Sequence, residues 1–98
     1  MRLTLTERAL KDIEEARAWY NNIGRDLGDA LHRDITRTID TVLERPRAFP
    51  EQKPGIRGAR CERFPYKVYY RIRSEDEVRV LAVSHLKRDP NRWDDPIR

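Results

Sequence analysis

The chain has 98 residues, 38% of them hydrophobic and 39% charged, and its formal net charge is +4 with the histidines neutral. This length allows one small core and excludes a second independent one, so residues 1–98 are expected to form a single domain. The chain is polar, but its apolar residues are periodic and it has four tyrosines and two tryptophans to bury, which favours a folded protein over a disordered one.

Cysteine and histidine are scarce. Cys61 is the single cysteine, which excludes an internal disulfide, and the presence of only two histidines, His32 and His85, argues against a zinc cluster. We therefore expect no metal and no cofactor, and we interpret Cys61 as a small, half-buried strand residue. The N-terminus lacks the apolar stretch of a signal peptide or membrane span, so a cytoplasmic protein without a membrane partner is expected.

The first half of the chain predicts a short strand followed by two helices. Residues 2–5 form the strand, with Leu3 and Leu5 facing inward. Thr4 and Glu7 have the spacing of a capping box and Thr6 is an alternative N-cap, so a helix is expected to begin at about residue 7 and to end at residues 21–24. Its apolar face comprises Ala9, Ile13, Ala16 and Tyr20.

A second helix is predicted from one apolar stripe, Leu27, Leu31, Ile35, Ile39 and Val42, and Arg45-Pro46 ends it. Because the turn between the two helices is short, they should pack as an antiparallel hairpin. Residues 47–56, which contain Pro50, Pro54 and Gly55, are expected to form one long loop.

Three strands are predicted in the second half, over residues 57–63, 66–73 and 78–84. Phe64-Pro65 marks a turn, because proline cannot donate to a strand ladder, and residues 74–77 are a hairpin loop. The run 78–84 is apolar at nearly every position and is expected to be the central strand. The predicted fold is α+β: a strand, a helical hairpin and three strands, with the hairpin covering one face of a mostly antiparallel sheet.

Positive charge is concentrated on one strand face. Residues 53–73 contain seven lysines or arginines and one acid, Glu62. This patch is predicted to bind a phosphate backbone or an acidic protein segment, in preference to being a merely solvated strand face. The residues predicted to bind nucleic acid are Lys53, Arg57, Arg63, Tyr69 and Arg71.

Several segments together resemble the toxins of the RelE/ParE superfamily. They are residues 16–20 (Ala-Arg-Ala-Trp-Tyr), 63–72 (Arg-Phe-Pro-Tyr-Lys-Val-Tyr-Tyr-Arg-Ile) and 80–85 (Val-Leu-Ala-Val-Ser-His), followed by Arg88-Asp89-Pro90 and Trp93. The resemblance covers essentially the whole chain. It implies the RelE/ParE-like fold and the toxin component of a type II toxin–antitoxin module, a growth inhibitor neutralised by a cognate antitoxin protein.

The two branches of the superfamily imply different targets. RelE-like toxins act on the ribosome as mRNA endonucleases, and this is the activity that we expect for the chain. The alternatives are a ParE-like toxin, which poisons DNA gyrase and is not an enzyme, and a degenerate toxin that binds its antitoxin and poisons nothing. In the first case the partners are the ribosome and mRNA, and in the second case the partner is gyrase.

The RelE pattern carries over only in part. Arg60 matches one of its basic positions while Gly58 stands at the companion position, Lys67 takes the place of an arginine, and Arg88 matches the arginine of the tail. Trp93 and Asp94 stand where a tyrosine is expected, whereas His85 resembles the histidine that ends the last strand in ParE-like members.

Metal-free RNA cleavage requires a proton-transfer group and cations around the phosphorane. The predicted catalytic residues are therefore Arg60, Lys67, His85 and Arg88, with His85 transferring protons and the three cations holding the phosphate. Plain structural roles remain open. His85 can be a hydrogen-bonded strand end, Arg88 can pair with an acid, and Lys67 and Arg71 can bind antitoxin carboxylates.

Overall fold

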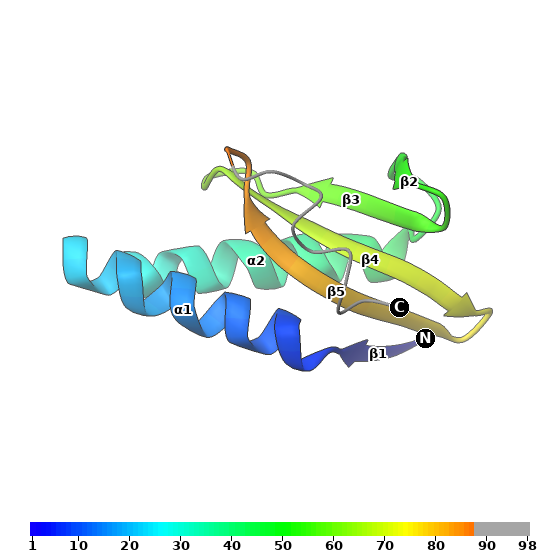
Figure 1. The fold of residues 1–98 in the computed structure, drawn as a ribbon, viewed down its shortest axis with the longest axis horizontal. Coiled ribbons are helices and arrows are strands. Elements are labelled where there is room, and N and C mark those ends of the chain that lie inside the picture. The colour runs from blue at the N-terminus through cyan, green and yellow to red at the C-terminus, as the bar shows by residue number, and fades with distance from the viewer. Residues whose placement is uncertain (88–98) are drawn as a thin grey trace.

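Two helices cover one face of a five-stranded sheet in the computed structural model, which describes residues 1–87 (Figure 1). The elements are β1 (Arg2–Leu5), α1 (Glu7–Ile23), α2 (Leu27–Glu44), β2 (Glu51–Lys53), β3 (Ile56–Arg60), β4 (Tyr66–Ser74) and β5 (Glu77–His85). The strand order is β1-β5-β4-β3-β2, and all neighbours are antiparallel except β1 and β5. The predicted α+β fold, with its N-terminal strand and helical hairpin, is confirmed.

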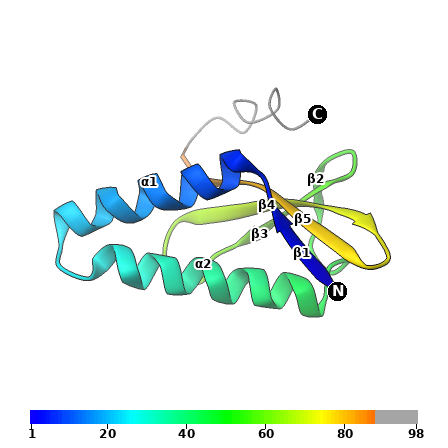
Figure 2. The ribbon, with the colours of Figure 1, turned by 90° about the horizontal axis from the view of Figure 1, so that it is seen from below.

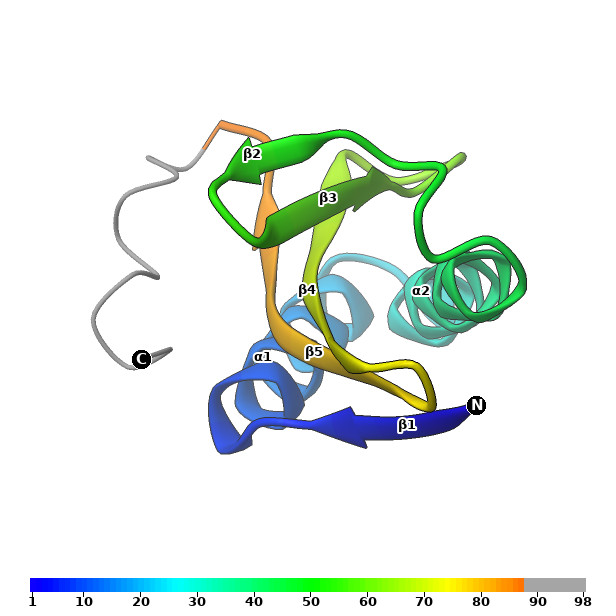
Figure 3. The same ribbon diagram turned by 90° about the vertical axis from the view of Figure 1, so that its right-hand side faces the viewer.

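The sheet differs from the prediction in three details. The predicted loop 47–56 contains β2, which pairs with β3 through a tight turn in which Gly55 has a φ of 77°. This is a conformation that glycine adopts without strain. The strand predicted over residues 57–63 ends at Arg60, and the middle strand of the five is β4, since β2 extends the sheet beyond β3. Figure 3 shows β1 and β2 at opposite edges of the sheet.

Helix α1 is anchored to the sheet at its first turn. The hydroxyl oxygen of Thr6 accepts a hydrogen bond from the Ala9 amide at 3.0 Å, and the same hydroxyl donates to the Leu81 carbonyl oxygen of β5 at 2.8 Å. The alternative N-cap, Thr6, is therefore the one used. The Thr4 hydroxyl of the predicted capping box donates to Glu77 instead.

The end of α1 packs closely against the start of α2, where a short turn joins the two helices (Figure 2). The Gly28 amide donates to the Asn21 side-chain oxygen at 2.7 Å, and a Cβ atom at Gly28 would collide with the Arg17 carbonyl oxygen. An ion pair of 2.8 Å between Arg17 and Asp29 joins the same turns. Only a glycine fits here, so the short hairpin that was predicted depends on this residue.

The main core lies between the helices and the sheet. Tyr70, Leu31, Ile35, Val42 and Val68 are its largest fully buried side chains. Tyr66, Val68 and Tyr70 of β4 belong to it and Ile72 packs against it, which confirms the predicted alternation along this strand. A smaller buried cluster, Ile56, Tyr69, Leu81 and Ala82, lies on the other face. We call this second face, which carries Lys67, Tyr69, Arg71 and Arg73 along β4, the outer face.

Candidate functional site

The loop that leads into β4 is held by a buried acid. Asp34 on α2 is 1% exposed, and its Oδ2 atom accepts hydrogen bonds from the backbone amides of Arg63 and Phe64 at 2.9 and 2.8 Å. Sequence reasoning missed this residue. The available signal was an acid at position 34, next to Ile35 in the apolar stripe, where a charge remains buried only if it has partners.

Cys61 lies beside this loop and is 2% exposed. It follows β3 and is fully buried, so the prediction of a half-buried strand residue is corrected in both respects. Burial raises the pKa of its thiol to about 11, although the Thr38 hydroxyl nearby lowers it. The thiol is therefore protonated at neutral pH and is a packing group.

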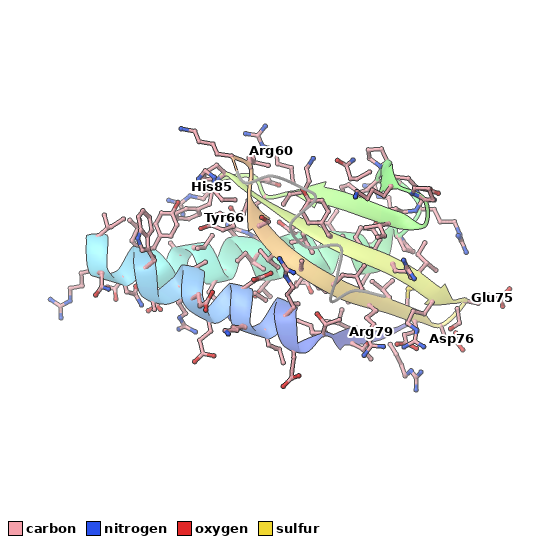
Figure 4. All side chains as sticks on the ribbon, viewed as in Figure 1. Arg60, Tyr66, Glu75, Asp76, Arg79 and His85 are labelled. Atoms are coloured by element: carbon pink, nitrogen blue, oxygen red, sulfur yellow. The ribbon has the colours of Figure 1, made fainter. Side chains whose placement is uncertain are left out.

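His85 lies at the end of β5, on the side of the sheet that faces the helices. It pairs in register with Tyr66, the two rings are 5.2 Å apart, and its Nδ1 atom accepts a hydrogen bond from the Lys87 amide at 3.0 Å. Figure 4 shows His85 and Tyr66 next to each other. These two side chains line a cavity of about 300 Å³ with Trp19 and Glu15 of α1.

Lys67 lies on the opposite side of β4 from Tyr66. It pairs in register with Arg60 of β3 and Ser84 of β5, and its Nζ atom donates to the Gln52 side chain at 3.2 Å. A Cβ atom at Gly58 would come within 2.9 Å of both Gln52 and Lys67. The glycine found in place of a basic residue therefore makes room for this pair.

The predicted catalytic residues fall into separate groups. His85 and Lys67 lie on opposite sides of the sheet, because side chains alternate along a strand. Arg60 is exposed and borders a cavity of about 150 Å³ beside α2. Arg88 lies outside the described residues, as do Trp93 and Asp94. Among the residues described, the candidate proton-transfer group and the candidate phosphate-binding cations do not converge.

The predicted nucleic-acid-binding residues are also dispersed. Arg57 donates to the carbonyl oxygens of Phe49 at 2.6 Å and Arg47 at 3.3 Å, so it holds the loop before β2. Tyr69 is 7% exposed. Arg63 is exposed with its guanidinium 5.7 Å from the Phe64 ring centre, Lys53 is half-buried on β2, and Arg71 is half-buried on the outer face of β4.

A second charged group that sequence reasoning missed lies on the outer face near the β4–β5 turn. Glu77 is held by the Thr4 hydroxyl at 2.8 Å, by Arg2 at 3.1 Å and by Arg73 at 3.8 Å. These contacts, the Thr4 hydrogen bond above all, keep the pKa of Glu77 below its ordinary value. Two residue pairs further along the same strands, Arg71 and Arg79 face each other directly.

The helical side carries an apolar groove. It has a volume of about 440 Å³ and is lined by residues of α1, α2 and β1. Figure 2 shows how these three elements are arranged. Leu10 on its wall is 54% exposed and Leu3 is 37% exposed. Its apolar lining residues are Leu3, Leu5, Leu10, Ile13, Ile35 and Ile39. Large apolar side chains left open in this way are typical of a surface that another protein covers.

The sequence matches one protein-family model over most of its length. Residues 3–90 match the family described as ParE toxin of type II toxin-antitoxin system, parDE. The chain belongs to this ParE toxin family. It is therefore a toxin of a type II toxin–antitoxin system, as the resemblance to the RelE/ParE superfamily implied. A comparison with curated proteins finds no match.

Solved structures share the ParE-like fold over nearly the whole chain. The chromosomal ParDE system from P. aeruginosa matches with a TM-score of 0.78 and 22% identity, over 89% of this chain and 97% of that chain. The isolated E. coli RelE toxin matches with a TM-score of 0.63 and 25% identity, over 91% and 87% of the two chains. The E. coli RelBE toxin–antitoxin complex matches with a TM-score of 0.63 and 24% identity, over 88% and 96%.

Residues 1–87 show neither a membrane-spanning helix nor a cluster of metal-binding side chains. Neither of the helices in that range is long and apolar enough to cross a membrane. No group of three or more histidine, cysteine, aspartate or glutamate side chains in the same range is arranged to hold a metal ion.

Proposed function

We propose that this ParE-family toxin inhibits growth by binding and poisoning DNA gyrase, and that a cognate antitoxin neutralises it. The observation that carries the proposal is the placement of His85 and Lys67 on opposite sides of the sheet. General acid–base catalysis requires the proton-transfer group within hydrogen-bonding reach of the reacting phosphate that the cations hold. A binding mode of action needs no such convergence, and the ParE family match agrees with it.

The test is a cleavage assay with purified gyrase and supercoiled plasmid. Addition of the toxin is expected to trap the enzyme on broken DNA, so that linear plasmid accumulates after detergent and protease treatment. Prior addition of the antitoxin encoded beside the toxin should prevent this. Plasmid that stays supercoiled or relaxed at all toxin concentrations, in cells whose growth the toxin nevertheless stops, would rule out gyrase as the target.

Ribosome-dependent mRNA cleavage is the second candidate function. It is supported by the register pairing of Lys67 with Arg60, which places two basic residues opposite each other at one end of the β3–β4 pair. Primer extension on translating ribosomes tests it, with a ribosome-free control and the Arg88→Ala variant. New 5′ ends at A-site codons that require ribosomes and disappear in the variant would establish the nuclease, and intact mRNA would exclude it.

The antitoxin is proposed to cover the groove between α1, α2 and β1. A solved relative, the RelBE complex from E. coli, is a toxin bound to its antitoxin. The groove here presents leucine and isoleucine side chains to solvent, and burial of such surface stabilises a complex by about 25 cal/mol per Å² before the costs of association. An amphipathic antitoxin segment with apolar residues on one face is the partner that this surface fits.

A further inference from the structure

Arg71 and Arg79 form a pair on the outer face that no acid of residues 1–87 neutralises. They are direct register partners across β4 and β5, so their side chains leave the sheet on the same side. Both residues are half-buried, and the Nε atom of each is buried without a hydrogen-bond partner. Like charges placed directly opposite each other destabilise a sheet, and a buried donor without an acceptor costs further free energy. The facing charges and the unpaired donors therefore cost the isolated fold free energy.

The neighbouring residues show what such a pair lacks. Two residue pairs away, Glu77 lies between Arg2 and Arg73 and also accepts a hydrogen bond from the Thr4 hydroxyl, so one carboxylate neutralises two arginines. Arg71 and Arg79 are likewise two neighbouring arginines, but no carboxylate of residues 1–87 lies between them. Glu77 itself is already bound by three groups and does not serve this pair.

The surroundings favour a single carboxylate over a nucleic-acid backbone. Glu75 and Asp76 are exposed in the adjacent turn, and Figure 4 shows Arg79 at that end of the molecule, away from Arg60 and His85. The buried cluster of Ile56, Tyr69, Leu81 and Ala82 separates the arginine pair from Lys67. The phosphate backbone of a nucleic acid crossing this face would be repelled by the acidic turn. It would also find no cation between Lys67 and the arginine pair.

We propose that Arg71 and Arg79 together bind one aspartate or glutamate side chain of a partner protein, and that this partner is the antitoxin. The antitoxin assignment rests on the function proposed above, whereas the carboxylate site itself does not. Guanidinium groups bind carboxylates through charge-assisted and often bidentate hydrogen bonds, and an acid between the two arginines would give both Nε atoms an acceptor.

The carboxylate site can be tested on the toxin alone. Arginine Nε–H signals in ¹⁵N-resolved NMR spectra are assigned with the Arg71→Met and Arg79→Met variants, and acetate is then titrated against inorganic phosphate and chloride at equal ionic strength. Acetate is expected to shift the Arg71 and Arg79 signals along a saturating curve and to leave the other arginine signals unchanged. Absence of a shift, or tighter binding of phosphate than of acetate, would overturn the proposal.

An acid from residues 88–98 is the rival occupant, because Asp89, Asp94 and Asp95 follow in the sequence. The same titration on a variant in which these three aspartates are asparagines decides the matter. If acetate shifts the two signals only in that variant, the chain itself supplies the carboxylate, and the proposed site for a partner is overturned.

The antitoxin assignment is tested with the Arg71→Met/Arg79→Met double variant. Methionine keeps the aliphatic stem and removes the charge, and Lys11→Met/Arg25→Met removes two exposed charges elsewhere as the matched control. The dissociation constant for the antitoxin is expected to rise roughly 30-fold in the first variant and to stay within about twofold in the control. Equal affinities of the first variant and the wild type would overturn the assignment.

The outcomes separate this proposal from the proposed function. If wild-type toxin binds no antitoxin while acetate still saturates the arginine signals, the carboxylate site stands and the antitoxin assignment fails. If the double variant binds antitoxin as tightly as wild type and still traps gyrase on DNA, the proposed function stands and the arginine site is not used by the antitoxin.

Discussion

Asp34 shows how one side chain positions a functional segment. Its carboxylate accepts from two consecutive backbone amides, those of Arg63 and Phe64, and so fixes the turn that leads into β4. The Phe-Pro-Tyr stretch that carries the family resemblance is therefore held from α2. Because this loop is fixed, β4 begins in a defined register, with Tyr66 and Lys67 on opposite sides of the sheet.

Asp34→Ala is expected to destabilise the protein by about 2–4 kcal/mol, because it leaves two backbone amides without their charged acceptor. Urea denaturation followed by circular dichroism measures this. Asp34→Asn, which keeps an oxygen able to accept both amides, should lose less. Asp40→Ala is the matched control, since Asp40 is exposed on the same helix and should change stability by less than about 0.5 kcal/mol. Equal stability of the Asp34→Ala and Asp40→Ala proteins would contradict this role.

Residue-level prediction succeeded where a pattern repeats and failed where a single contact decides. The stripe of Leu31, Ile35 and Val42 is visible from its spacing, and the structure buries all three. Asp34 occupies the same stripe, but nothing in the spacing reveals that its partners are amides 29 and 30 residues further along the chain. The site residues Lys67 and His85 were located on the right strands, yet their separation follows only from alternation combined with the register.

At the scale of the element, the edge strand β1 is fastened to β5 by Glu77. The Thr4 hydroxyl and the Arg2 guanidinium both reach this carboxylate from β1, in addition to the parallel backbone pairing. They lower the pKa of Glu77 below its ordinary value of 4.5. An acid with a lowered pKa contributes stability above that ordinary value, and the contribution is lost as the pH falls through the lowered value.

The Glu77→Gln variant is therefore expected to be less stable than wild type at pH 7, with a difference that shrinks as the pH falls below about 4.5. Urea midpoints measured at intervals from pH 7 to pH 3 give the difference curve. Glu75→Gln, a change in the exposed turn beside it, is the control and should show a small difference at every pH. A Glu77 difference that is independent of pH would show that the charge of Glu77 does not contribute.

For the facing arginines Arg71 and Arg79, removal of a charge is expected to raise stability instead of lowering it. Arg79→Met is expected to stabilise the isolated toxin by about 0.5 kcal/mol, since it removes a like-charge pair and an unsatisfied buried donor. Thermal unfolding of the free toxin measures the change, with Arg33→Met on the exposed face of α2 as the control. A clear loss of stability in Arg79→Met would mean that the arginine is already satisfied within the free protein.

The register that creates this pair was beyond the reach of the sequence. The β4–β5 ladder shifts by one residue between Ile72 and Ser74 and shifts back between Tyr69 and Tyr70. At each shift one strand has an extra residue, so cross-strand partners cannot be found by counting outward from the turn. Composition and alternation predicted four of the five strands but missed β2. The cross-strand neighbours depend on two irregularities that no local pattern marks.

At the scale of the whole molecule, the two faces have different characters. The helical side presents an open apolar groove, and the outer face presents cations in two groups separated by a buried cluster. The net charge of the chain comes from its second half, which builds that outer face. A partner that uses both faces has to be apolar where it meets the helices and acidic where it meets β4 and β5.

The groove leads to the last prediction. Leu10→Asp places a charge at the centre of the proposed antitoxin surface, where a bound helix would bury it, and should weaken antitoxin binding by at least about tenfold. Ile23→Asp is the matched control, because Ile23 is 58% exposed against 54% for Leu10 and does not line the groove. Calorimetric titration of each toxin with the antitoxin measures the affinities, and circular dichroism verifies that both variants fold.

Growth measurements on the same two variants separate neutralisation from poisoning. A Leu10→Asp toxin that still stops growth, but is no longer rescued by co-expressed antitoxin, would place the antitoxin on the helices and leave the target-binding surface elsewhere, consistent with a role for the outer face. A Leu10→Asp toxin that the antitoxin binds as tightly as it binds the Ile23→Asp toxin would move the antitoxin off the groove. The arginine pair on the outer face would then be the remaining surface to test.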